Sequence, residues 1–245
     1  MYQLELARSG RLLFKIRKFN MYVLIAVGVV VAYFVHDLGP FADHRADKAW
    51  FWLSLAVALT GALIRVITSG FAAFGTSGKT KREARAEELN TTGPYSLVRN
   101  PLYVGRIVNF TGIAMLTGSW VYGAIVFLVS VLVYERIAVF EEEFLIGKFG
   151  DEHRNWARQV RALVPRLHGY VPPKYDFWWR RMIWREYKKF FQLGSALIMY
   201  DFVRRDFELP TDAFDLFWYY AYGGLFAVRA GFSIATRAGY FEDLK

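Results

Sequence analysis

Long apolar runs constrain this chain more than any other feature of its sequence. Six such runs alternate with polar segments: residues 21–35, 50–68, 102–116, 120–139, 190–203 and 214–235. A helix needs about 20 mainly apolar residues to cross the hydrocarbon core of a bilayer. We therefore expect one all-α domain over residues 1–245, a polytopic transmembrane helix bundle of about six spans. Residues 190–203 are short for a span, and a half-buried helix is the alternative there.

Lysine and arginine concentrate in three of the polar segments, residues 1–20, 70–101 and 140–189. Cytoplasmic loops carry an excess of these residues, so an N-terminus inside the cell and six crossings would place all three in the cytoplasm. The fourth apolar run continues without a helix breaker into a cytoplasmic helical segment, with turns expected at Gly147 and Gly150. We expect an integral protein of a bacterial inner membrane with its active site facing the cytoplasm.

The amino-acid composition excludes several kinds of reaction chemistry for this chain. The chain has no cysteine, which excludes disulfides and thiolate nucleophiles, and its four histidines lack metal-ligand spacing, so no metal is expected. The net charge of +9 lies beside apolar runs, which favours contact with anionic lipid headgroups over nucleic acid. Carboxylates, tyrosines, arginines, backbone groups or an organic cofactor remain for any reaction.

Small residues recur at helical spacing within the apolar runs. Gly105, Asn109 and Gly112 share one face, which predicts a closely packed hairpin between the third and fourth spans, with Asn109 donating an interhelical hydrogen bond. Arg65 near the end of the second span either snorkels to the interface or binds an anion. Arg229 lies inside the last span and needs a partner or a watery pocket.

The segment from Gly93 to Gly105 joins a turn to a helix start. Pro101 suits the first turn of a helix, so the third span should begin there. Such a start presents backbone N–H groups to an anion. The alternative is an ordinary helix start after a proline, with Arg99 acting as a topology charge.

An acidic run, Glu141-Glu142-Glu143, follows the fourth span. Glu135 and Glu142 lie seven residues apart and share a helical face. Carboxylates in this position suit an ammonium or a ribose. The alternative is a solvated, charged helix end.

These two stretches resemble a known family. Thr91-Thr92-Gly93-Pro94-Tyr95-Ser96-Leu97-Val98-Arg99-Asn100-Pro101-Leu102-Tyr103-Val104-Gly105, then two spans, then Glu141-Glu142-Glu143-Phe144-Leu145-Ile146-Gly147-Lys148-Phe149-Gly150, and then Pro165 follow the order and spacing of the isoprenylcysteine carboxyl methyltransferase and phospholipid methyltransferase superfamily. The resemblance covers about residues 93–165. It implies an integral membrane enzyme that transfers a methyl group from S-adenosylmethionine to an oxygen or nitrogen atom.

The resemblance also implies roles for individual residues. Cofactor binding is expected of Tyr95, Arg99, Asn100, Pro101, Tyr103, Gly105 and Glu142. Catalytic roles are expected of Arg136, Glu141 and Glu142. The matched segment 93–165 would be the methyltransferase core, and residues 166–245 a C-terminal extension with two further membrane helices.

The sequence departs from the family pattern in places. Asn100 replaces the usual histidine; it can hydrogen-bond a cofactor carboxylate or amine but cannot carry a proton charge near neutral pH. His153 and Trp156 stand where tyrosines commonly follow the Phe-Gly pair.

The acceptor is left open among a prenylated cysteine, a lipid phosphate, a phospholipid headgroup and a small hydrophobic acid. An anionic acceptor needs no base and is favoured by basic side chains near the spans, namely Arg65, Arg106, Arg136 and Arg229. An amine acceptor must lose a proton, and a glutamate or tyrosine would assist.

Two other functions compete with this interpretation. Membrane sterol and enone reductases carry a similar loop and use NADPH, but Leu102 and Arg106 stand where that variant has asparagine and glutamate. A non-catalytic membrane scaffold of the same fold is the second alternative, and the replacement at Asn100 supports it.

Overall fold

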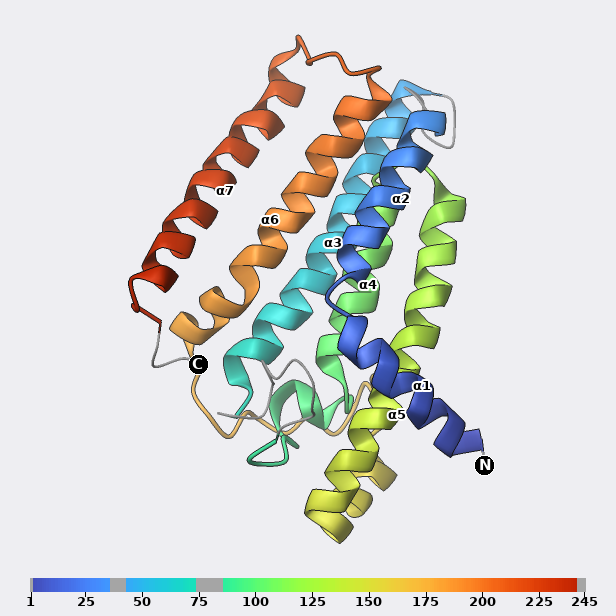
Figure 1. The fold of residues 1–245 in the computed structure, drawn as a ribbon, viewed down its shortest axis with the longest axis vertical. Helices are drawn as coiled ribbons and strands as arrows, with labels where there is room; N and C mark the ends of the chain where they lie inside the picture. The colour runs from blue at the N-terminus through green and yellow to red at the C-terminus, as the bar shows by residue number, and fades with distance from the viewer. Residues whose placement is uncertain (1, 36–42, 74–85, 242–245) are drawn as a thin grey trace. The chain divides into compact units, whose positions relative to one another are not determined.

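The computed structural model describes residues 2–35, 43–73 and 86–241, and every regular element in those ranges is helical (Figure 1). The α-helices and one 3₁₀ helix, η1, follow in this order: α1 (Tyr2–Ile16), α2 (Asn20–Val35), α3 (His44–Phe71), η1 (Gly93–Ser96), α4 (Pro101–Met115), α5 (Trp120–Gln159), α6 (Trp179–Arg204) and α7 (Ala213–Arg237). The all-α class predicted from the sequence is confirmed.

Two helices are long and apolar enough to cross a membrane by themselves. They are Arg45–Phe71 within α3 and Trp120–Gln159, which is α5. A third span results if the bent pair Glu5–Ile16 and Asn20–Val35 is counted as one. The chain is thus a membrane protein with at least these candidate spans among its described residues.

The contacts divide the chain into two compact units. Unit 1 comprises Met1–Asn20, Leu63–Ile107 and Leu128–Met182, and unit 2 comprises Met21–Ala62, Val108–Phe127 and Ile183–Lys245. Both family motifs lie in unit 1, whereas Arg229 lies in unit 2.

In unit 2, α4 packs against α3 through its smallest side chains. A Cβ atom added to Gly112 would lie 2.2 Å from the backbone nitrogen of Ala58. Asn109 donates its amide N–H to the carbonyl of Ala58 at 2.8 Å, which confirms the predicted interhelical hydrogen bond. The hairpin was predicted to pack through this face, but Asn109 and Gly112 contact α3. The tight Thr117-Gly118-Ser119 link leaves α5 beside a different face of α4, where Gly123 meets Met115.

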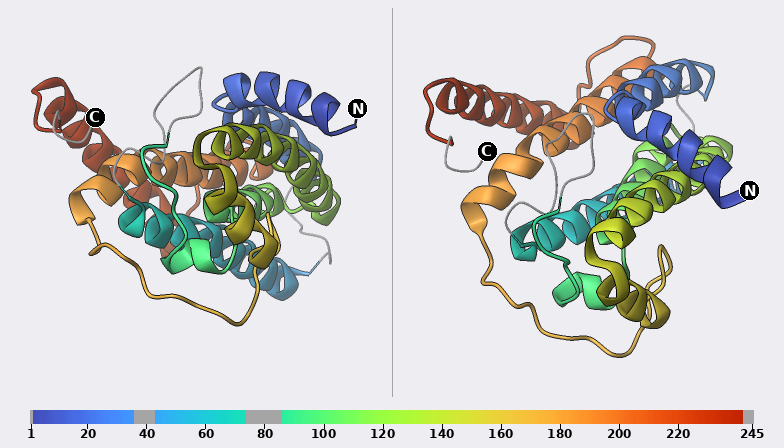
Figure 2. Two further views of the ribbon diagram at one scale, coloured as in Figure 1. Left: turned by 90° about the horizontal axis from the view of Figure 1, so that it is seen from below. Right: turned by 60° about the horizontal axis from the view of Figure 1, so that its bottom comes forward.

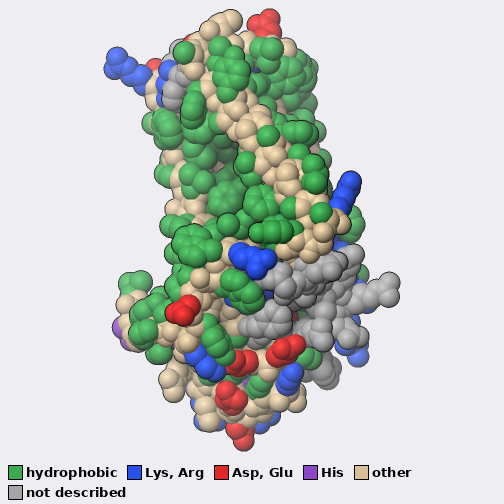
Figure 3. All heavy atoms as spheres, turned by 90° about the vertical axis from the view of Figure 1, so that its left-hand side faces the viewer, with side chains coloured by type: hydrophobic (Ala, Val, Ile, Leu, Met, Phe, Trp, Pro, Cys, Tyr) green, Lys and Arg blue, Asp and Glu red, His purple; other side chains and the backbone are tan. Residues whose placement is uncertain are grey.

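The helices α6 and α7 form an antiparallel pair whose contact lies in unit 2 (Figure 1). The hydroxyls of Ser195 and Tyr222 lie 3.0 Å apart, and the ring of Phe191 stacks on that of Tyr222 at 5.5 Å. Large apolar side chains of α7 are exposed, among them Phe217, Tyr220 and Phe226, and hydrophobic side chains gather on the upper part of the face drawn in Figure 3. Such a surface is typical of a helix that faces lipid.

Three boundaries differ from the sequence-based expectation. The helix α3 begins at His44, six residues before the apolar run at 50. Gly147 lies inside α5, and the break comes only at Gly150, where φ is 52°. The helix α6 begins at Trp179, eleven residues before the apolar run at 190. Residues 160–178 run between α5 and α6 as an extended segment within unit 1 (Figure 2).

Candidate functional site

The loop before α4 is built from a 3₁₀ turn that opens at Gly93, whose φ of 58° favours glycine. The hydroxyl of Ser96 donates to the carbonyl of Gly93 at 2.6 Å and accepts the backbone N–H of Val171 at 3.0 Å. The N–H of Gly93 donates to the carbonyl of Val171 at 2.8 Å. Ser96 therefore joins this turn to the extended segment 160–178.

The same segment also holds the residues that precede α4. The backbone N–H of Arg99 donates to the carbonyl of Arg161 at 2.9 Å, and that of Asn100 to Ala162 at 3.2 Å. Two of the N–H groups expected to bind an anion are therefore paired within the chain. Pro101 opens α4 as predicted.

The two family motifs meet through a side-chain ion pair. Arg99 donates from Nε to Oε1 of Glu142 at 2.9 Å and from Nη2 to Oε2 at 2.9 Å. Its third nitrogen donates to the carbonyls of Ala157, at 3.0 Å, and Val160. The side chains are 14% and 19% exposed. A bidentate, partly buried pair of this kind is among the stronger polar contacts in proteins.

Asn100 joins the same cluster. Its amide donates to Oε1 of Glu142 at 3.4 Å and to the carbonyl of Ala162 at 3.3 Å. The residue that replaces the family histidine thus lies against the acidic motif.

A second contact between the motifs involves Tyr103 and Glu141. The Tyr103 hydroxyl donates a hydrogen bond to the Glu141 carboxylate, and both residues are half-buried. The Tyr103 ring stacks on that of Tyr134 at 5.1 Å, and the Arg106 guanidinium carbon lies 6.0 Å from the Tyr134 ring centre. Arg106 is therefore close to this part of the site.

The three remaining predicted arginines have different partners. Arg65 is 7% exposed and donates to the carbonyl of Leu102 in the first turn of α4, at 3.1 Å. Arg136 instead donates to Leu132 of its own helix at 3.0 Å, and the Arg229 guanidinium carbon lies 4.4 Å from the centre of the Phe191 ring in unit 2.

Of the other cofactor residues, Tyr95 lies in η1, and Gly105 is buried in the second turn of α4. The roles expected of all these residues stay predictions.

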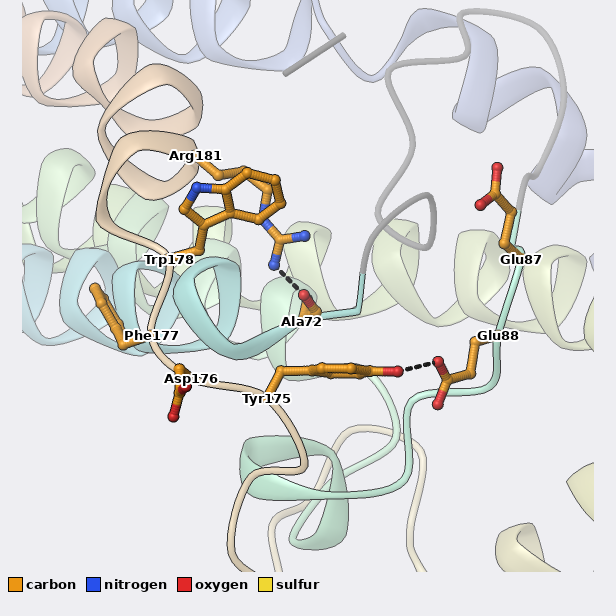
Figure 4. Close-up of a pocket in the computed structure, with 8 residues that line it drawn as sticks. All are labelled: Ala72, Glu87, Glu88, Tyr175, Asp176, Phe177, Trp178 and Arg181. Atoms are coloured by element: carbon orange, nitrogen blue, oxygen red, sulfur yellow. Dashed lines mark hydrogen bonds between the residues drawn. The ribbon is translucent and has the colours of Figure 1, made fainter. Parts of the chain in front are cut away.

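Unit 1 also contains a cavity of about 590 Å³. Its described lining residues include none of the predicted site residues. Its lining includes Ala72, Glu88, Tyr175, Trp178 and Arg181. In Figure 4 the Tyr175 hydroxyl points at Glu88, and the Arg181 guanidinium points at the carbonyl of Ala72.

Glu88, which lines this cavity, forms an ion pair with Lys174. Hydrogen bonds donated by Lys174 and Tyr175 hold the pKa of the Glu88 carboxyl below its ordinary value. The backbone N–H of Lys174 also donates to the hydroxyl of Thr92 at 3.1 Å. Sequence reasoning missed this cavity, because no motif links residues 72–88 to residues 174–181.

His153 and Trp156, near the ion pair, were noted in the sequence only as departures from the family. His153 is 1% exposed, and the charges of Glu142 and Arg99 act on it. Its ring meets that of Trp156 edge to face at 5.6 Å. The signal in the sequence that could have identified them was the replacement of the tyrosines that the family commonly has at these two positions.

Comparisons with known proteins support the resemblance. Residues 51–152 match the phospholipid methyltransferase family. A cobalt-zinc-cadmium resistance protein of Cupriavidus metallidurans is 32% identical over 147 residues, which are 60% of this chain and 65% of that protein. A methanethiol S-methyltransferase of Mycobacterium tuberculosis is 30% identical over 168 residues, which are 61% of this chain and 64% of that protein.

A protein-S-isoprenylcysteine O-methyltransferase of Schizosaccharomyces pombe is 32% identical over 79 residues, 32% of this chain and 34% of that protein. The chain thus spans about one third to two thirds of the length of these relatives. No solved structure matches it. Residues 51–152, which contain both motifs, match the phospholipid methyltransferase family, and the chain is similar to methanethiol and isoprenylcysteine methyltransferases.

Proposed function

We propose that this chain is an S-adenosylmethionine-dependent methyltransferase of the membrane that acts on a lipophilic acceptor. The acceptor class is an isoprenylcysteine-like carboxylate, a lipid phosphate or a phospholipid headgroup. One observation carries the proposal: Arg99 and Glu142, 43 residues apart in the chain, join the two family motifs in a bidentate ion pair.

The donor set of this region fits such a cofactor. S-adenosylmethionine carries an ammonium, a carboxylate, a ribose diol and an adenine, so its site needs both donors and acceptors. Asn100 and Tyr103 provide both, and Glu141 provides an acceptor. When bound, the cofactor supplies an electrophilic methyl group on a sulfonium. The proposed binding residues are Tyr95, Arg99, Asn100, Pro101, Tyr103, Gly105 and Glu142.

The protein contributes mainly by position and charge. Methyl transfer is an in-line displacement, in which alignment of the two reactants lowers the barrier. Arg99 holds Glu142 in one orientation, and Arg65 and Arg106 are the proposed partners of an anionic acceptor. For an amine acceptor, the hydrogen-bonded pair of Tyr103 and Glu141 is the proposed proton acceptor.

The proposal includes a membrane topology. All of residues 1–245 form one membrane-embedded domain with six spans, α2 to α7, in a bacterial inner membrane, and the cluster around Arg99 faces the cytoplasm. Residues 93–165 are the catalytic core. The extension 166–245 selects the acceptor, and it contributes Tyr175, Trp178 and Arg181 to the cavity of unit 1.

A non-catalytic role is the second candidate. Asn100 stands where the family has histidine, and one relative is named for metal resistance and not for methyl transfer. A reductase function is not favoured, because Leu102 and Arg106 differ from the reductase pattern.

Calorimetric titration of the detergent-purified protein tests the proposal. We expect binding of S-adenosylmethionine and S-adenosylhomocysteine and no binding of NADPH. Glu142→Ala should abolish methyl transfer into total lipid extract, whereas Asp151→Ala, which removes an exposed carboxylate from the same helix, should not. Failure of the wild-type protein to bind either methyl-cofactor form would refute the methyltransferase assignment.

A further inference from the structure

The short helical stretch after Gly150 buries polar side chains where an amphipathic helix normally buries apolar ones. His153 and Val160 are fully buried and Trp156 and Ala157 partly so, while Asp151 and Arg154 are exposed. The spacing of the buried set, i, i+3, i+4 and i+7, marks one helical face. That face therefore carries an imidazole and an indole into the interior.

This face is turned toward the ion pair of the two motifs. The carbonyls of Ala157 and Val160 accept hydrogen bonds from Arg99, which is bound to Glu142. His153 lies one turn before Ala157. It is therefore next to the region proposed to bind the cofactor.

Three polar atoms on this face have no partner among the described residues. They are Nδ1 and Nε2 of His153 and Nε1 of Trp156. Burying such atoms without hydrogen bonds destabilises a fold, and native proteins seldom retain them without a role. Their grouping beside Arg99 and Glu142 indicates a polar ligand.

The hydrogen-bonding requirements of these three atoms limit which chemical group of a ligand can bind them. A neutral imidazole has one N–H donor and one acceptor nitrogen, and an indole has one donor. Together they need two acceptors and one donor. A carboxylate has no donor and an ammonium has no acceptor, whereas a vicinal diol offers both because each hydroxyl rotates to suit its partner.

We propose that His153 and Trp156 bind the ribose diol of the cofactor. The inference rests on the proposed function. It assigns the ribose to these residues because their ring nitrogens lack hydrogen-bond partners among the described residues, whereas Glu142 is already bonded to Arg99 and Asn100 and can accept a further bond from another part of the cofactor. An adenine edge also combines donors and acceptors, and the experiment separates it from the diol.

The test measures binding of S-adenosylhomocysteine and of its 2′-deoxy, 3′-deoxy and 7-deaza analogues by calorimetry. Wild-type protein should bind a deoxy analogue about tenfold more weakly than the parent compound, the effect of one hydrogen bond. His153→Phe should bind the parent about tenfold more weakly and lose this discrimination. The matched control is His168→Phe, at an exposed histidine of the same unit, and it should behave as wild type.

Thermal unfolding without ligand provides a second readout. Replacing an unpartnered buried imidazole by a phenyl ring should leave the melting temperature unchanged or raise it. If His153→Phe does not fold, His153→Gln and Trp156→Phe are measured instead. His153→Gln should bind S-adenosylhomocysteine within about threefold of the wild-type affinity, and Trp156→Phe should bind it several-fold more weakly.

The outcomes separate the two proposals. Absence of binding to wild-type protein refutes the proposed function itself. Tight binding by wild type and by His153→Phe alike refutes only the role of His153. Discrimination against the 7-deaza analogue, and not against the deoxy analogues, also refutes it, because the adenine would then be the bound group.

Discussion

Removal of the Glu142 carboxylate should destabilise the fold as well as disturb the proposed site. In the double-mutant cycle, Arg99→Ala, Glu142→Ala and the double variant are compared with wild type. Breaking a fully buried pair costs about 3–5 kcal/mol. Since the two side chains are 14% and 19% exposed, we expect about 2 kcal/mol for Glu142→Ala.

This free energy corresponds to a measurable shift. In a chain of this size, 1 kcal/mol moves the melting temperature by about 2–4 °C, so Glu142→Ala should lower it by about 4–8 °C. Arg99→Ala should cost more, because the carbonyls of Ala157 and Val160 also lose a donor. The assay is thermal unfolding in detergent without cofactor.

The cycle isolates the coupling between the two residues. The double variant should be less destabilised than the sum of the single variants, by about 2 kcal/mol. The control is Asp151→Ala, whose pair with Arg154 is 56% and 84% exposed and should change the melting temperature by less than about 2 °C. Additive losses in the cycle would show that the ion pair does not hold the motifs together.

Two further predictions concern packing and pH. Gly112→Ala should destabilise by about 1–3 kcal/mol in thermal unfolding, because its Cβ would lie 2.2 Å from the Ala58 nitrogen, whereas Gly224→Ala, with open space around it, should be neutral or stabilising. The lowered pKa of Glu88 means that its stabilisation is present above about pH 4.5 and is lost as pH falls through the lower folded value. The hydrogen-exchange protection factors of residues 174–178 should therefore fall at low pH in wild type and be low at all pH values in Glu88→Gln; pH-independent protection in wild type would contradict this.

The sequence predicted helix positions well where local chemistry decides them. Pro101 has no backbone N–H and a φ suited to a helix start, and α4 begins there. Asn109 had few ways to satisfy its amide within an apolar run, and it bonds another helix. The partner helix was not predictable, because a small-residue face records close packing but not the neighbour.

The start of α6 was misplaced because residues 179–189 mix tryptophan with many basic residues. This composition is typical of a segment on the membrane surface. Yet Trp184 and Tyr187 are buried, so tertiary packing stabilises a helix that continues into the apolar run. Composition alone does not distinguish a segment on the membrane surface from the first turns of a longer helix.

The meeting of the two motifs was predictable, but the atoms involved were not. Order and spacing indicated that residues near 99 and 142 share a site. The sequence did not show that Arg99 is occupied by Glu142 and two carbonyls. Those carbonyls belong to residues 157 and 160, outside either motif, and only the fold brings them to Arg99.

The backbone hydrogen bonds between the 93–100 loop and residues 161–171 have a consequence for biosynthesis. Gly93, Leu97, Arg99 and Asn100 each exchange backbone hydrogen bonds with residues that the ribosome adds more than sixty positions later. The loop therefore cannot reach its final conformation while the ribosome is still adding α4 and α5. Its assembly waits for the translation of residue 171, so a chain arrested before that point would contain both motifs but lack a finished site.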